Sequence, residues 1–152
     1  MILIGFIIIL LLGGLLAWLL GRWNTAGLEG LYSLRLTVVT SDQAVQESVI
    51  QVTVDNTPPQ VALTVPVEGD ELRVVGTNPV MEASVDYSDD VGVVRVVYYL
   101  DGEAAATATE APFSAPLVLD SLGSHSLWAE AFDAAGNSGL SERVSFTVRR
   151  GE

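Results

Sequence analysis

Hydrophobic and polar positions follow different patterns in successive parts of the chain. From Met1 to Gly21 the side chains are apolar or small, and none is charged. Apolar and polar residues then alternate, first over residues 32–39 and again over residues 50–54. Alternation is typical of half-buried β-strands, because successive side chains of a strand point to opposite faces. The pattern therefore predicts one long apolar segment followed by a β-hairpin.

The apolar segment is long enough for a transmembrane helix. About 20 residues at about 1.5 Å each cover the roughly 30 Å of a bilayer's hydrocarbon core. A cleaved signal peptide or a buried helix would be the alternatives. A signal peptide needs a basic start and a cleavage site of small residues, and residues 1–5 and 19–22 supply neither. We expect residues 1–21 to be an uncleaved membrane anchor, with Trp18 and Trp23 near one interface.

Beyond the hairpin, Pro58 and Pro59 remove two backbone donors and stop strand pairing. The following short alternating segments, separated by turn residues, are typical of an all-β sandwich. Asp101 and Gly102 predict a tight hairpin turn, and residues 89–92 and 134–139 are expected to be loops. The expected strands cover residues 61–65, 72–75, 80–87, 93–100, 104–109, 117–119, 125–132 and 144–148.

An internal repeat links the hairpin to the end of the sandwich. Residues 30–34 (GLYSL) match residues 123–127 (GSHSL) at an offset of 93, and residues 52–54 (VTV) match residues 146–148 (FTV) at an offset of 94. The hairpin thus has the pattern of the last two strands of an incomplete domain. An isolated hairpin is marginal in water, so it must pack against the second domain or another chain, or stay partly loose.

We therefore divide the chain into four parts. Residues 1–21 form the anchor, residues 22–55 the orphan hairpin, residues 56–149 a complete sandwich domain, and residues 150–152 a solvated tail.

Composition excludes several functions. The 152 residues carry a formal net charge of -12, and the seven basic residues are all arginine. Without lysine or cysteine, Schiff-base chemistry, lysine contacts to phosphate, thiol nucleophiles, thiolate metal sites and disulfides are excluded. An acidic chain also offers phosphate backbones little counter-charge, so no nucleic-acid partner is expected.

The single histidine, His125, is the obligatory base of any serine–histidine–aspartate site in this chain. Its counterpart in the repeat is Tyr32. Both lie at the start of a penultimate strand, where sandwich domains often place a tyrosine that bonds back to the preceding loop. We therefore expect a structural role for His125 and no catalytic residues.

Acidic and amide side chains gather in segments that we expect at one end of the sandwich: Asp55, Asp89, Asp90, Asp133 and Asn137. Calcium takes six to eight oxygen ligands in flexible geometry, so these residues are candidate calcium ligands. The alternative is that they serve as turn and capping residues. No other cofactor is expected.

A second candidate site follows from strand faces. If Val94, Val96, Tyr98 and Leu100 point inward, their neighbours point outward. The residues expected to form an apolar outer patch, flanked by Arg95 and Arg143, are Val97, Tyr99, Trp128 and Phe132. Such a patch usually marks a contact. Sugar rings, another protein and the chain's own hairpin are the alternatives, beside ordinary surface exposure.

Three motifs together resemble a known family: the DNTPP boundary at residues 55–59, the Asp101–Gly102 turn, and the pattern GxHxLxAxAxDxAGN over residues 123–137. They are similar to bacterial immunoglobulin-like, or fibronectin-III-like, repeats. The resemblance implies an extracytoplasmic stalk or tail module. Residues 23–28 look like the start of tail modules of penicillin-binding proteins, but the Ser-x-x-Lys motif of that chemistry requires a lysine, which the chain lacks.

The expected fold is therefore an all-β immunoglobulin-like sandwich, preceded by one transmembrane helix and an orphan hairpin. The expected function is a membrane-tethered, non-enzymatic spacer or interaction module at the bacterial cell surface, whose partner is a surface protein or cell-wall polysaccharide. An accessory binding module of a larger envelope enzyme is the alternative. Arg22 alone would keep the C-terminal side cytoplasmic, but the resemblance implies a single-pass protein of the cytoplasmic membrane with its C-terminal domain outside.

Overall fold

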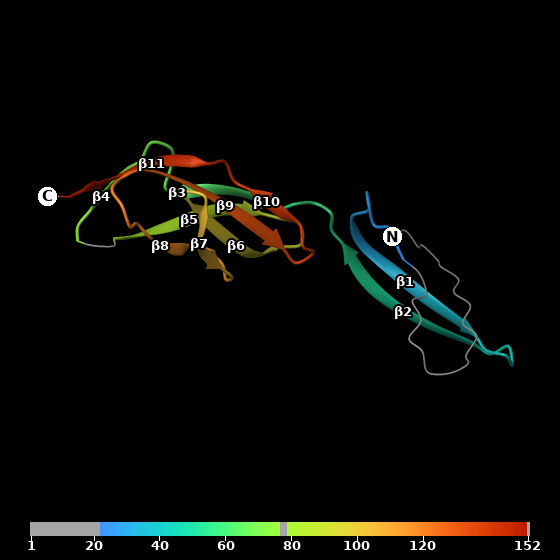
Figure 1. Cartoon of the computed structure of the whole chain (residues 1–152). Coiled ribbons are helices and arrows are strands. Elements are labelled where there is room, and N and C mark those ends of the chain that lie inside the picture. The colour runs from blue at the N-terminus through green and yellow to red at the C-terminus, as the bar shows by residue number, and fades with distance from the viewer. Residues whose placement is uncertain (1–21, 77–78, 152) are drawn as a thin grey trace. The chain divides into compact units, whose positions relative to one another are not determined.

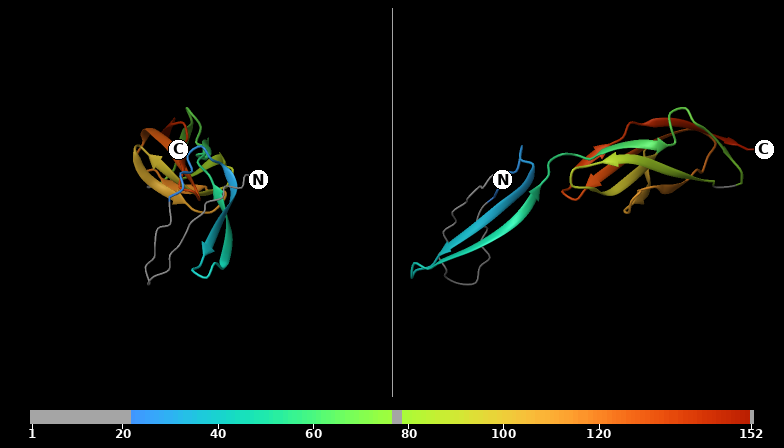
Figure 2. Two further views of the ribbon diagram at one scale, coloured as in Figure 1. Left: turned by 90° about the vertical axis from the view of Figure 1, so that its right-hand side faces the viewer. Right: turned by 180° about the vertical axis from the view of Figure 1, so that it is seen from behind.

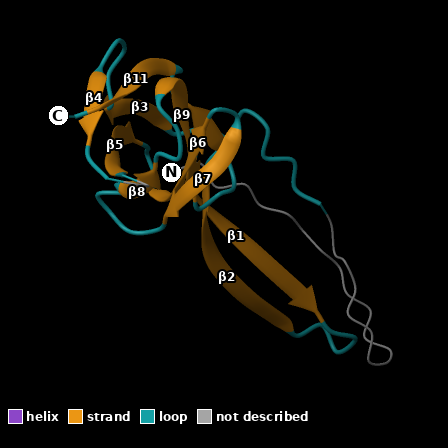
Figure 3. Cartoon of the chain, turned by 60° about the vertical axis from the view of Figure 1, so that its left-hand side comes forward, coloured by secondary structure: helices purple, strands orange, loops and turns teal. Residues whose placement is uncertain are grey.

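The computed structural model describes residues 22–76 and 79–151. The chain divides into two units, Met1–Asn56 and Thr57–Glu152. The regular elements in the described part are all strands, which confirms the all-β prediction there (Figure 3). The expected anchor, residues 1–21, lies outside the described residues. Among the described residues no helix has the length and apolarity to span a membrane.

The first unit contains a long antiparallel hairpin of β1 (Gly30–Val39) and β2 (Val45–Val54) (Figure 1). The strands pair without a break from Gly30 with Val54 to Val39 with Val45, so both are longer than the alternation alone indicated. In the turn, the Thr40 N–H donates to the Ala44 carbonyl at 2.9 Å. The Asp42 carboxylate accepts hydrogen bonds from the Thr40 hydroxyl and the Ala44 N–H, and these lower the pKa of Asp42.

Asn56 closes the base of this hairpin. Its side-chain amide donates to the carbonyl oxygens of Thr25 at 2.9 Å and Leu28 at 2.8 Å. Its backbone N–H donates to the Glu29 carboxylate at 3.0 Å. The segment before β1 is thereby fixed to Asn56, the second residue after β2.

The second unit is a two-layer β-sandwich (Figure 2). One sheet has the order β4-β11-β9-β6-β7, with β10 also paired to β9, and the other has the order β3-β5-β8. The strands are β3 (Gln60–Val65), β4 (Glu71–Val74), β5 (Val80–Ser88), β6 (Val93–Leu100), β7 (Glu103–Ala108), β8 (Ala115–Val118), β9 (Gly123–Asp133), β10 (Ser138–Leu140) and β11 (Val144–Arg150).

Alternating side chains of the two sheets fill the space between them. The most deeply buried large side chains include Tyr98, Phe146, Leu117 and Leu127. The Tyr98 hydroxyl donates to the Phe113 carbonyl at 2.8 Å, which satisfies the one polar atom that this ring brings into the core. Burial, with a smaller contribution from the Glu82 charge, raises the pKa of Tyr98 to about 12. The phenol therefore stays neutral at ordinary pH.

Two details differ from the sequence-based expectation. Residues 138–139, expected to lie in a loop, belong to β10, which pairs with residues Glu130–Phe132 of β9. Val94, expected inward, is 46% exposed. A register shift between Val93 and Arg95 in the β6–β9 pair breaks the alternation at this point.

Candidate functional site

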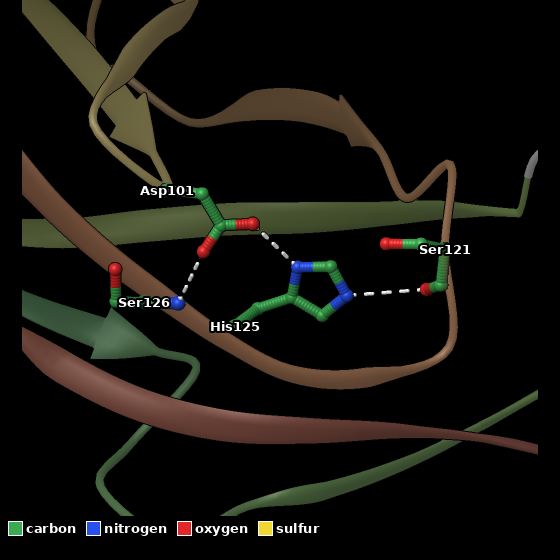
Figure 4. Close-up of polar contacts among 4 residues, drawn as sticks. All are labelled: Asp101, Ser121, His125 and Ser126. Atoms are coloured by element: carbon green, nitrogen blue, oxygen red, sulfur yellow. Dashed lines mark hydrogen bonds and ion pairs between the residues drawn. The ribbon is translucent and has the colours of Figure 1, made fainter.

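His125 holds two loops together at one end of the sandwich (Figure 4). It lies at the start of β9 and is only 5% exposed. Its Nδ1 atom lies 2.7 Å from Asp101 Oδ2, and its Nε2 atom lies 3.1 Å from the Ser121 carbonyl oxygen. Each ring nitrogen of His125 thus has an oxygen within hydrogen-bonding distance. The bond to Ser121 goes back to the preceding loop, as expected for a structural corner.

Asp101 is the partner of His125 that sequence reasoning missed. Its Oδ1 atom accepts a hydrogen bond from the Ser126 N–H at 2.8 Å. Burial opposes ionisation of this carboxyl, but the bonds from Ser126 and His125 outweigh it and lower its pKa. Asp101 also takes a positive φ of 51° in the β6–β7 turn. The position of Asp101 before Gly102 predicted the turn. It did not predict that the Asp101 carboxylate would contact His125 and Ser126.

The opposite end of the unit carries the acidic loops. Asp133, at the end of β9, is 4% exposed. Its Oδ1 atom accepts the N–H groups of Gly136 at 2.7 Å and Asn137 at 2.9 Å, and its Oδ2 atom accepts the Asn137 side-chain amide at 2.7 Å. Burial opposes ionisation, but these bonds and one from the Ala135 backbone dominate and lower the pKa of Asp133.

Asp89 lies beside Asp133 in this acidic end. A carboxylate oxygen of each lies within 4.8 Å of the other. Asp89 Oδ2 caps its own turn, accepting the N–H groups of Val91 at 2.9 Å and Gly92 at 2.6 Å. Asp89 Oδ1 is buried and has no hydrogen-bond partner within the described part of the chain.

The other two calcium candidates are Asp90 and Asp55. Asp90 is exposed on the surface of its loop, and Asp55 directly follows β2 in the first unit. Of the five candidates, the second unit thus brings together Asp89, Asp133 and Asn137. The hydrogen bonds of Asp133 and Asn137 are those of turn capping, while the closeness of two carboxylates is the feature that suits a cation.

The expected apolar patch lies on the outer face of the larger sheet, where β6 and β9 are paired. Tyr99 lies opposite Trp128 in the register, and the two rings stack with centroids 5.2 Å apart at 6°. Arg95 lies opposite Phe132, with its guanidinium 4.0 Å from the ring centroid. Val97 fills the row between these two pairs, opposite Glu130.

Arginine side chains cover this aromatic row. The Arg143 guanidinium lies 4.0 Å from the Trp128 ring centroid, on the strand side where β11 begins. The Tyr99 hydroxyl donates to Glu130 at 3.1 Å. The four residues of the row are therefore partly buried: Val97, Tyr99, Trp128 and Phe132. The row offers stacked ring faces, cationic guanidinium groups and a carboxylate, which suit a flat or hydrogen-bonding partner.

The comparisons with known proteins concern mainly the second unit. Residues 59–129 match the family described as bacterial Ig domain. No curated protein matches the chain by sequence.

The chain is also similar to solved structures. The fibronectin(III)-like modules of Clostridium thermocellum CbhA are 27% identical, with a TM-score of 0.55, and the match covers 80% of this chain. The chain spans 64% of the length of that structure. The D00-D0 domain of intimin is 15% identical with a TM-score of 0.40, over 60% of this chain and 49% of that one.

Proposed function

We propose, on the premise that residues 59–129 belong to a bacterial immunoglobulin-like domain, that this chain is a non-catalytic spacer or interaction module tethered outside the cytoplasmic membrane. One observation carries the non-catalytic part. Within the described residues, the buried polar side chains are His125 and Asp133. Both hold loops through short hydrogen bonds, so they serve the fold and are not poised for chemistry.

Tethering is supported by the sequence. Residues 1–21 have the length and the lack of charge that a transmembrane helix needs. The resemblance to modules of extracytoplasmic stalks supports a C-terminal domain outside the cell.

A reporter fusion tests the location and topology. Alkaline phosphatase, which is active only outside the cytoplasm, would be fused after Glu152 of the full chain. We expect active enzyme in the membrane fraction, and loss of membrane retention when Leu11 and Leu12 are both changed to arginine. Activity released in soluble form from the unchanged chain would point to cleavage, and an inactive fusion to the opposite topology.

A binding function is the second candidate, and the aromatic row is the observation that favours it. Stacked Tyr99 and Trp128 under Arg143 resemble the flat ring surfaces that contact sugars or other planar groups. In this case the chain would be a wall-binding or substrate-binding accessory of a larger envelope enzyme.

Co-sedimentation with insoluble peptidoglycan separates the two candidates. Trp128→Ala removes the centre of the row, and Val118→Ala, on an exposed position of the other sheet, is the matched control. Far-UV circular dichroism would establish that both variants remain folded. If the unchanged chain sediments and only Trp128→Ala abolishes this, the row is a binding face. If the unchanged chain stays in solution, the spacer function is favoured.

A further inference from the structure

The hairpin of the first unit pairs in the same register as the last hairpin of the second unit. β1 corresponds to β9 at the repeat offset of 93, and β2 to β11 at the offset of 94. In the two hairpins, Gly30–Val54, Tyr32–Val52 and Leu34–Ile50 correspond to Gly123–Val148, His125–Phe146 and Leu127–Val144. Gly30 and Gly123 also share a positive φ, of 94° and 120°. The two hairpins are thus equivalent pieces of one fold.

The equivalence shows what the edge of β1 is built to accept. In the second unit, the edge of β9 that faces away from β11 is paired with β6, antiparallel. Among the described strands, β1 has β2 as its single neighbour. The edge that carries an antiparallel strand in one repeat has no strand paired to it in the other, within residues 22–76 and 79–151.

The edge of β1 also lacks the usual features that prevent pairing. Natural edge strands are short, bulged, charged or interrupted by proline. The second unit follows this rule: β4 and β8 have four residues each, β8 contains Pro116, and register shifts interrupt the β3–β5 and β6–β7 pairs. β1, in contrast, runs for ten residues without proline or register shift, and Arg35 is its one charged residue.

We propose that β1 is a homodimerisation edge, on which β1 of a second copy adds antiparallel to form a four-stranded sheet β2-β1-β1-β2. A two-fold axis generates antiparallel pairing of identical strands, and β-strand addition to an open edge is a common mode of recognition. The apolar residues Tyr32, Leu34, Leu36 and Val38 share one face of β1, so pairing like faces makes this face continuous across the dimer.

Charge selects the register. Centring the pair on Arg35 would place two arginines directly opposite each other, which is unfavourable. Centring it on Leu36 places Arg35 opposite Thr37 of the second copy. Thr37 is paired with Glu47 in its own hairpin, and its hydroxyl donates to Glu47 at 3.3 Å. Glu47 of the second copy then lies on the same face, one strand beyond Thr37 and about 10 Å from Arg35 between Cα atoms. The long Arg35 side chain can reach across Thr37 to this carboxylate, in addition to its own 4.0 Å contact with Glu47.

Oxidative cross-linking tests this register. The chain has no cysteine, so a single introduced cysteine reports one position. The full chain in mild detergent, carrying Leu36→Cys, is expected to form a disulfide-linked dimer rapidly. Ser48→Cys, which lies opposite Leu36 on β2, is the matched control and is expected to cross-link at least about tenfold more slowly. Equal rates at both positions, or a monomeric full chain in sedimentation velocity, would overturn the proposal.

Mixing complementary charge variants separates contacts between copies from contacts within one hairpin. Arg35→Glu and Glu47→Arg each place like charges at both contacts of their own dimer, and each is expected to weaken self-association about tenfold. A one-to-one mixture restores opposite charges between copies but not within either hairpin. We expect the mixture to regain the association of the unchanged chain. A mixture that stays as weak as its components would show that the effect is internal to the hairpin and overturn the proposed register.

Discussion

At the scale of single residues, the polar side chains buried in the second unit hold loops in place. Asp133 accepts two backbone N–H groups and one side-chain amide, and His125 connects the β6–β7 turn to the loop before β9. The sequence predicted a structural role for His125 from its repeat partner. It could not identify Asp101 as the other half, because the two residues meet only through the pairing of β6 with β9.

Replacing Asp133 tests the importance of its loop contacts. Asp133→Asn keeps the shape but puts an amide nitrogen where an acceptor is needed, so we expect a loss of about 1–3 kcal/mol in the free energy of unfolding at pH 7. Because the folded-state pKa of Asp133 lies below its ordinary value, its stabilisation is present above the unfolded pKa and is lost as pH falls through the folded one. The difference in unfolding free energy between the unchanged chain and Asp133→Asn should therefore become smaller in acid.

Urea unfolding of the full chain at pH 7 and pH 3 measures this gap. The exposed Asp90, changed to asparagine, is the control and should match the unchanged chain at both pH values. A gap for Asp133→Asn that is the same at pH 3 would show that ionisation of Asp133 does not contribute.

The acidic end with Asp89 and Asp133 can also be tested for calcium binding. Both oxygens of Asp133 already accept hydrogen bonds, and a calcium ion would have to compete with these donors. We therefore expect the thermal midpoint of the second unit to be the same in calcium and in chelator. A rise of several degrees with calcium that Asp89→Asn abolishes would instead establish the acidic end as a cation site.

At the scale of elements, alternation predicts strands well where a strand is long and one face is buried. Alternation does not predict a register shift within a strand pair or a strand of only three residues. Val94 is exposed because a register shift in the β6–β9 pair turns its side chain outward. β10 was missed because three residues in a glycine- and serine-rich segment carry no period. The outer aromatic row was predicted from faces alone, but the positions of Arg95 and Arg143 over the rings depend on side-chain packing.

Position 139 in β10 requires a glycine because the backbone of Pro59 leaves no room for a side chain. A Cβ atom there would lie 1.8 Å from the backbone oxygen of Pro59. Gly139→Ala must displace either β10 or the chain that leads into β3, and we expect a loss of about 3 kcal/mol in unfolding free energy. Ser138→Ala, an exposed neighbour, is the control. Chemical denaturation measures both, and a nearly neutral Gly139→Ala would mean that the two segments part easily.

At the scale of the whole molecule, the two units differ in how their equivalent strands are supported. Val148 and Phe146 of β11 are about 1% exposed, whereas most of β2 is exposed along its length. The repeat was visible in the sequence, but its different environments were not, because they depend on which other strands surround each copy.

Hydrogen exchange of the full chain at low concentration tests this difference. We expect amides of β1 and β2 to exchange at least about a hundredfold faster than their counterparts in β9 and β11, since a lone hairpin opens at little cost in free energy. Protection in β1 should then rise with protein concentration if copies pair through it. Equal protection of both hairpins in dilute solution would show that the first is already supported within one copy.

The parallel pairing of β4 with β11 has a mechanical consequence. Glu71–Val74 pair with Thr147–Arg150 in the same direction, and the Thr147 and Gly151 N–H groups add bonds to Asp70 and Val74 on either side. A force that pulls the unit by its two ends reaches β11 directly and β4 through β3, and it loads the parallel β4–β11 pair along the strands. The hydrogen bonds between the two strands then carry the load together instead of breaking one after another. We therefore expect the second unit to resist unfolding under tension.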